Sequence, residues 1–473
     1  MLRRTLTLLL AATMLSGCTL APAYHRPGLP VGQAWPVATA TAPAGASAGD
    51  LAWRDVFQDS RLQQVIDLAL RQNRDLRIAV GSIERARAQY RVQRAELLPA
   101  INAVGSESKV HSPIGVSQTG QTGTFDQYSA TVGFSAYELD LFGRIRSLSA
   151  AALQNYFAVE ENRRTVQISL IAEVAADYLI LAADQDLLAI AQDTLKSRED
   201  ALTIIQKRFD AGAASQLDLN QAQTLAEQAR SDAAVAIAQV AQDRNALQLV
   251  VGGEVPAALL PNGDLAAVGM LADLQPGLPS EVLTRRPDVL AAEHSLQAQN
   301  ANIGAARAAF FPRISLTAAT GSASTELGDL FKAGTGAWSF APQIVLPLFA
   351  GGANVANLKG AKAGRDIAIA QYEKAIQTAF REVSDALAVR ATVRDRVSAQ
   401  EHLVTAAASA QRLSQARYDR GVDAYLVLLD AQRTLYAGRQ TLLTAKLVEA
   451  LNRVELYKAL GGGAPPEPLR GHD

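Results

Sequence analysis

Two long stretches of the chain have the hydrophobic pattern of very long helices. Residues 144–211 contain neither glycine nor proline, and residues 365–420 are likewise uninterrupted. At about 1.5 Å per residue, the first stretch predicts a helical rod on the order of 100 Å long. Apolar residues recur at every seventh position in the first stretch, at Val174, Leu181, Leu188, Leu195, Leu202 and Phe209. Such a repeat predicts left-handed packing against neighbouring helices; the second stretch keeps it in part, at Val383, Val397, Val404 and Tyr418.

Each long stretch ends in nearly the same phrase, RFDAGAASQLDLNQAQ from residue 208 and RYDRGVDAYLVLLDAQ from residue 417. Gly212 and Gly421 can adopt the left-handed conformation that ends a helix. Ser215 and Asp423 are suited to cap the helices that follow. The sequence therefore predicts two helical hairpins, over residues 144–251 and 353–460, with the repeated phrases at their tips.

Residues of about 98–140 and 312–349 alternate small or apolar with polar side chains and contain turn-rich loops. Their length, weak alternation and aromatic ends favour two hairpins of transmembrane barrel strands over a small soluble sheet. Four strands cannot close a barrel, and an open edge leaves backbone groups unpaired in lipid. Copies of the chain must therefore combine, and a trimer is favoured because side chains fill an eight-stranded dimeric barrel.

The order of parts divides the chain into two repeats. We predict a signal peptide at 1–17, a lipidated N-terminal tether at 18–57, a first repeat at 58–253, a linker at 254–280, a second repeat at 281–463 and a tail at 464–473. The predicted fold is mainly α, with a membrane β-barrel portion of four strands per chain closing as a trimer.

The N-terminus indicates export and lipidation. Arg3 and Arg4 precede an apolar stretch at 6–15 that is followed by LSGC, which resembles a bacterial lipobox. Cys18 is the predicted lipid-bearing residue and the only cysteine, so disulfides do not stabilise the chain. By resemblance to known lipoproteins, Thr19 favours the outer over the inner membrane.

Charge and composition narrow the class of partner. The formal net charge is −1, which gives no indication of a nucleic-acid partner. Hydrophobic residues make up 49% but aromatic residues only 5%, a balance suited to close helix packing. Beyond the signal we expect no transmembrane helix, so that any crossing of the membrane is made by strands.

Candidate chemistry is absent from the sequence pattern. The five histidines are scattered and show no metal-binding spacing, and no phosphate-binding glycine loop is present. We therefore expect no enzyme activity, no cofactor and no metal site, and any energy for transport has to come from a partner.

Several motifs resemble those of the outer membrane factor family, the TolC- and OprM-like efflux channels, and above all its NodT-type lipoprotein branch. They are LSGCTLAPAY, FQDSRLQQVIDLALRQNRDLRIA, YELDLFGRIR, RRPDVLAAEHSLQAQNANIGAARAAFFPRI, LPLFAGG and RYDRGVDAYLVLLDAQR. The resemblance implies a trimer with a 12-stranded barrel and a 12-helix periplasmic tunnel. It implies passive export of drugs or other solutes with a periplasmic adaptor and an inner-membrane pump, most often of the RND type.

The resemblance also assigns site residues. The closed periplasmic aperture of OprM-like channels corresponds here to Tyr418, Leu426, Asp430 and Arg433. The first-repeat equivalents, Phe209, Leu217, Gln221 and Thr224, lack both charges. The hairpin tips are the expected adaptor-docking surface, with Asp210, Gly212, Ser215, Asp218, Asp419, Gly421 and Asp423. An exit duct for type I protein secretion and a non-conducting, periplasm-spanning lipoprotein remain alternatives.

Overall fold

The computed structural model describes residues 19–36, 52–113, 122–268, 274, 277 and 279–462. It is mainly helical with one four-stranded sheet, which confirms the predicted fold class. The chain forms two compact units, and each unit draws on both sequence repeats. The first contains residues up to 28, 82–160 and 291–372; the second contains 29–81, 161–290 and from 373 onward.

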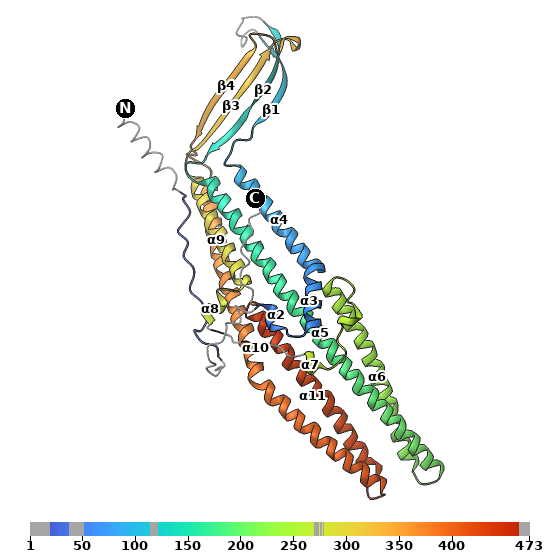
Figure 1. Cartoon of the computed structure of the whole chain (residues 1–473). Helices are drawn as coiled ribbons and strands as arrows, with labels where there is room; N and C mark the ends of the chain where they lie inside the picture. The colour runs from blue at the N-terminus through green and yellow to red at the C-terminus, as the bar shows by residue number, and fades with distance from the viewer. Residues whose placement is uncertain are drawn as a thin grey trace. The chain divides into compact units, whose positions relative to one another are not determined.

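The first unit holds the sheet (Figure 1). Its strands are β1 (Asn102–Ser112), β2 (Gly123–Leu139), β3 (Arg313–Ser324) and β4 (Gly336–Val345). They are antiparallel in the order β1-β2-β3-β4, so β2–β3 pairing joins the hairpins of the two repeats. A short turn, η3 (Leu327–Asp329), lies between β3 and β4. β1 and β4 are the two edges of this sheet.

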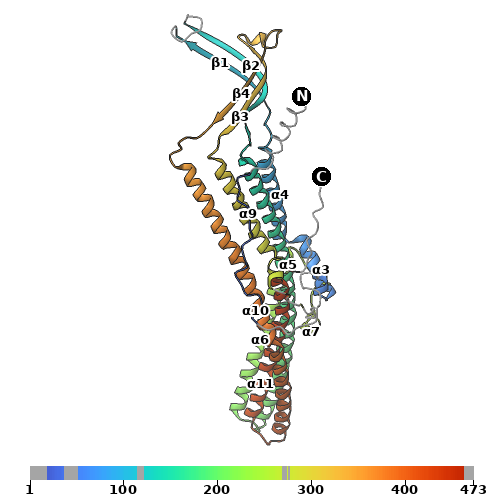
Figure 2. The same ribbon diagram turned by 90° about the vertical axis from the view of Figure 1, so that its left-hand side faces the viewer.

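Helical segments continue from the sheet within the first unit. These segments belong to α4 (Arg74–Ala95), α5 (Arg144–Asp210), α9 (Pro287–Ala308) and α10 (Ala353–Asp419). Figure 2 shows α4, α5 and α9 running side by side here. Ala151 of α5 packs on Ala298 and Ala301 of α9. Small side chains at these positions allow the close helix packing that the alanine-rich composition predicts.

The N-terminal segment of the first unit lies along α9. Arg307 Nη1 donates to the Leu20 carbonyl at 3.0 Å, and Asn300 Nδ2 donates to the Pro22 carbonyl at 2.7 Å. Glu293, whose side chain is 6% exposed, accepts a bidentate pair of bonds from Arg26 at 2.8 and 2.7 Å. The part of the predicted tether from residue 19 to 28 is thus held by side chains rather than left free.

The second unit contains the tips of two helical hairpins. α5 is followed by α6 (Gln216–Val251), which begins directly after the predicted cap Ser215. α10 is followed by α11 (Tyr425–Ala459), which begins one residue later than a cap at Asp423 would give. Val174 and Leu181 are fully buried, and Leu188 and Leu195 pack against Ala191, Ala233 and Ala236. The heptad positions of α5 therefore form helix-packing core, as predicted.

Short elements complete the second unit. They are α2 (Trp53–Val56), α3 (Ser60–Gln72), η2 (Ala257–Leu259), α7 (Leu265–Val268) and α8 (Pro279–Leu283). A buried ionic cluster ties α9 to the hairpin that follows it: Arg286 Nη2 lies 2.7 Å from both Asp288 and Glu382, and its Nη1 donates to the Ala459 carbonyl at 2.7 Å. This cluster secures the C-terminal end of α11.

The expectation that no helix is apolar enough to cross a membrane needs correction. α5 contains an 18-residue window that passes this test by length and composition, and 56% of that window is buried inside the structure. The low charge of the window is explained by its place in the helix-packing core, where Val174, Tyr178 and Leu181 are fully buried.

Candidate functional site

The two hairpin tips have the same backbone geometry. Gly212 and Gly421 have φ values of +71° and +72°, the left-handed region expected of them. At the first tip the Ala213 amide donates to the Arg208 carbonyl at 2.7 Å; at the second the Val422 amide donates to the Arg417 carbonyl at 2.9 Å. This bond across six residues is the helix-ending motif that a glycine permits. The repeated phrase thus encodes one turn twice.

The caps of the return helices differ between the tips. Ser215 forms a capping box with Asp218, in which each side chain bonds the backbone amide of the other. The prediction that Asp423 caps α11 is wrong, because the N-cap is Ala424 and makes no side-chain bond. Asp423 instead accepts from Arg417 Nε and Nη2 at 2.6 and 2.8 Å. The Arg417 guanidinium lowers the pKa of the Asp423 carboxyl below its usual value.

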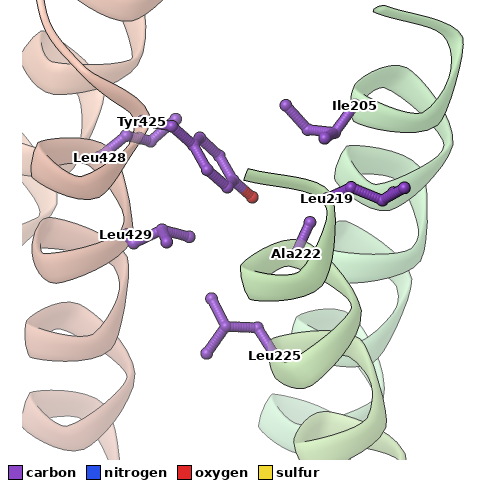
Figure 3. Close-up of a cluster of buried hydrophobic side chains, with 7 residues drawn as sticks. All are labelled: Ile205, Leu219, Ala222, Leu225, Tyr425, Leu428 and Leu429. Carbon is purple, nitrogen blue, oxygen red and sulfur yellow. The ribbon is translucent and has the colours of Figure 1, made fainter. Parts of the chain in front are cut away.

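A buried apolar cluster joins the tips of the two hairpins (Figure 3). We call it the tip seam; its buried members are Ile205 of α5, Leu219, Ala222 and Leu225 of α6, and Tyr425, Leu428 and Leu429 of α11. Figure 3 shows the three α11 side chains directed toward the first hairpin. Any movement of α11 relative to the first hairpin must repack this seam.

The four predicted aperture residues fall into two groups. Tyr418 is half-buried and packs against the tip seam, with its ring centroid 5.3 Å from that of Tyr425 and 5.1 Å from the Arg208 guanidinium carbon. Leu426 is 58% exposed, and Asp430 and Arg433 are exposed on α11 as well. Leu426, Asp430 and Arg433 share one face of the helix, whereas Tyr418 does not belong to that face.

Asp430 and Arg433, the two charged residues predicted at the aperture, do not pair with each other. These two side chains are i,i+3 neighbours, but among the described residues they form no ion pair with each other. Both charges are therefore available on the exposed face. At two positions the first-repeat equivalents match the second repeat in exposure: Phe209, like Tyr418, is half-buried against the tip seam, and Leu217, like Leu426, is exposed.

The predicted docking residues lie at the turns and the adjoining helix ends, and all four of their carboxylates accept hydrogen bonds within the chain. Asp210 accepts from Gln206 at 2.9 Å, and Asp419 accepts from Gln415 at 3.0 Å. Asp218 and Asp423 make the cap and ion-pair contacts given above. These bonds hold the acidic side chains of both tips in defined positions.

Sequence reasoning missed two participants of this site. Tyr425 directly follows the N-cap and is buried in the tip seam. In the sequence it is the first residue of the apolar run YLVLL, and nothing distinguishes it there from its neighbours. Arg417 would have been found from its spacing of six residues to Asp423, had the turn been considered as a unit. The predicted lipidation residue, Cys18, lies outside the described residues.

Comparison with known proteins identifies the class. A family model described as outer membrane efflux protein matches residues 65–253 and 278–462. The chain is 47% identical over 466 residues to the probable efflux pump outer membrane protein TtgC of Pseudomonas putida, covering 98% of this chain and 96% of that protein.

Solved structures give the same result. A membrane protein of Pseudomonas aeruginosa superimposes with a TM-score of 0.89 at 43% identity, covering 94% of this chain and 98% of that one. The open state of the Neisseria gonorrhoeae MtrE outer membrane channel superimposes with a TM-score of 0.86 at 42% identity, with the same coverage.

Long helical hairpins and a small antiparallel sheet, matched over nearly their full length, define an outer membrane channel of the efflux type. The chain belongs to the outer membrane efflux protein family. It is the outer membrane component of an efflux pump, and this family is one of ducts rather than enzymes.

Proposed function

We propose that this chain acts as a homotrimer that forms the passive exit duct of a tripartite efflux system for drugs or other small solutes. An inner-membrane transporter of the RND type would supply the energy and a periplasmic adaptor would connect it to the duct. Lipidation at Cys18 would add an anchor in outer membrane lipids, since several acyl chains hold a protein firmly to a membrane.

The observation that carries the trimer proposal is the open sheet. β1 and β4 are edges, and their exposed apolar side chains include Val104, Val110, Trp338 and Ile344. Lipid offers no hydrogen-bonding partner for an open edge. In a trimer, β4 of each copy pairs with β1 of the next, which closes the sheet into a barrel. Each copy also contributes its two helical hairpins to the tunnel below the barrel. Twelve strands leave a wet lumen where eight do not.

The exposed face of α11 is the proposed aperture. Three-fold symmetry would turn Asp430 and Arg433 into rings of like charges, with Leu426 forming an apolar collar one turn nearer the tip. Tyr418 would act from the adjoining tip seam, where it fixes the end of α10. Asp210, Gly212, Ser215, Asp218, Asp419, Gly421 and Asp423 form the proposed adaptor-docking tips.

Disulfide cross-linking tests the assembly. Cys18 is the only cysteine, so Ser108→Cys in β1 can be combined with Ser339→Cys, Ala341→Cys or Gln343→Cys in β4 without competing thiols. At least one pair should yield a covalent three-chain species in outer membranes, and each single variant serves as its control. Cross-linked dimers alone would exclude the trimer.

Ionic conductance and the phenotype of a gene deletion distinguish an efflux duct from a structural lipoprotein and from a type I secretion duct. Purified protein in planar bilayers should give stable ionic currents, whereas a non-conducting structural lipoprotein would give none. Deleting the gene should lower resistance to small toxic solutes while leaving protein secretion intact. Loss of a secreted protein with unchanged resistance would favour type I secretion instead.

A further inference from the structure

A buried charge interrupts the core of the first hairpin just above the tip seam. Arg198 of α5 stands midway in a heptad series between Ala191 and Ile205, which are both fully inside the helix packing. The Arg198 residue is itself only 7% exposed. Within the described part of the chain its Nη1 has no hydrogen-bond partner. A buried charge without a partner is costly, so this residue works against the packing that surrounds it.

The facing stripe of α11 carries a second unsatisfied group. At about 100° per residue, Tyr425, Leu428, Leu429 and Gln432 fall on one face of α11, and the first three are members of the tip seam. The Gln432 Oε1 atom is buried and lacks a hydrogen-bond partner among the described residues. One acceptor and one donor are thus left unused beside an otherwise apolar seam.

Arg433 stands at the border between that stripe and the proposed aperture face. Burial lowers the pKa of the Arg198 guanidinium; Tyr425 raises it and the positive charge of Arg433 lowers it again. Within the part of the chain that the structure describes, no carboxylate shifts the pKa of Arg198. Arg433 thus adds an unfavourable positive charge near Arg198, close to the tip seam where Ile205 of α5 meets α11.

We propose that Arg198 is a positioning residue for the aperture: its unpaired buried charge weakens the tip seam and so allows α11 to move away when the duct opens. The proposal rests on the proposed function, in particular on the aperture face of α11. One face of α11 packs in the tip seam, the other is the proposed aperture face, and Arg433 lies at the border between the two faces. A seam made entirely of apolar contacts would hold α11, and with it the aperture, in the packed arrangement.

The test replaces Arg198 by Met, which keeps an unbranched side chain and removes the charge. Arg198→Met trimers should be at least as heat-stable as the parent, because a desolvated charge is lost. Their open fraction in planar bilayers should fall by about tenfold, within the range of couplings known for two-state proteins. Arg198→Lys should keep the parental open fraction, and Lys196→Met, on the exposed side of the same helix turn, is the control.

The outcomes are separable. Lower heat stability or failed assembly of Arg198→Met would overturn the proposal, because a structural role predicts that loss. An unchanged open fraction of Arg198→Met would also overturn the role of Arg198. That result would leave the proposed aperture intact if the double variant Asp430→Ala, Arg433→Ala still alters conductance. In an Arg433→Met background the effect of Arg198→Met should shrink; an undiminished effect would exclude action through Arg433. If no aperture variant alters conductance, the aperture itself is refuted.

Discussion

Arg417 and Asp423 bridge the second hairpin tip with two charged hydrogen bonds of 2.6 and 2.8 Å. At the first tip, the capping box of Ser215 and Asp218 fixes the turn instead. The same backbone turn is therefore fixed in two different ways: by an ion pair across the turn and by a cap on the return helix.

Ala424→Ser should stabilise the second tip. Ala424 has the extended backbone of an N-cap, with φ −65° and ψ 152°, but no side-chain oxygen. A serine there can accept a bond from a first-turn amide of α11, a change worth about 0.5–2 kcal/mol. Hydrogen exchange of the Leu426 and Val427 amides should slow. Ser215→Ala is the mirror experiment and should accelerate exchange at the first tip; equal exchange in both variants and the parent would contradict the capping argument.

Replacing Asp430 and Arg433 together by Ala should loosen the aperture. Removing both charged rings takes away the polar contacts that the proposed closed state makes between copies. Conductance of purified trimers in planar bilayers should rise above the parental value. Gln221→Ala with Thr224→Ala, at the equivalent first-repeat positions, is the matched control and should leave conductance unchanged. A double aperture variant with parental conductance would remove these residues from the gate.

Arg286→Met should be strongly destabilising. Its side chain is 8% exposed and bonds Asp288, Glu382 and the Ala459 carbonyl. Breaking a fully buried ion pair costs about 3–5 kcal/mol, and the loss here should lie below that range because the Asp288 and Glu382 side chains are 33% and 32% exposed. Thermal unfolding followed by circular dichroism measures this loss. Arg365→Met, which breaks only the exposed pair with Asp366, should cost less than about 1 kcal/mol.

Asp184→Asn should stabilise the protein at high pH more than at low pH. Burial, followed by a hydrogen bond to Asp243, raises the pKa of Asp184 to about 7 from its ordinary value of 3.8. The protonated carboxyl therefore contributes stability that is fully present below about pH 4 and is lost as the pH rises through 7. The gain in melting temperature of the variant should grow from about pH 5 to about pH 8. A gain independent of pH would contradict the raised pKa of Asp184.

Gly304→Ala should release the N-terminal segment from α9. A Cβ at Gly304 would lie 2.7 Å from the Ala21 amide nitrogen and from Ser147 Oγ. Exchange of the amides of residues 20–24 should accelerate. Gly360→Ala is the control, because a Cβ there meets open space and alanine favours the helix by about 0.5–1 kcal/mol. Protection of residues 20–24 that persists in Gly304→Ala would show that the segment is held by Glu293, Asn300 and Arg307 alone.

Much of this molecule follows from local pattern. Uninterrupted heptads at Val174 and Leu181 determine long helices because a core stripe recurs with the helical period. Gly212 and Gly421 determine the turns because a left-handed residue ends each helix there. Even the number of strands follows from the alternation of side chains over the two sheet regions.

Tertiary structure alone decided which of these local possibilities is used. Asp423 has the chemistry of a cap, but Arg417 reaches it across the turn and leaves the N-cap to Ala424. Arg198 has the sequence context of an ordinary charged position in a long helix, and only the packing of neighbouring helices around α5 buries it. Sequence periodicity places a residue on a face of its own helix, whereas its partners and its burial depend on which other helix covers that face.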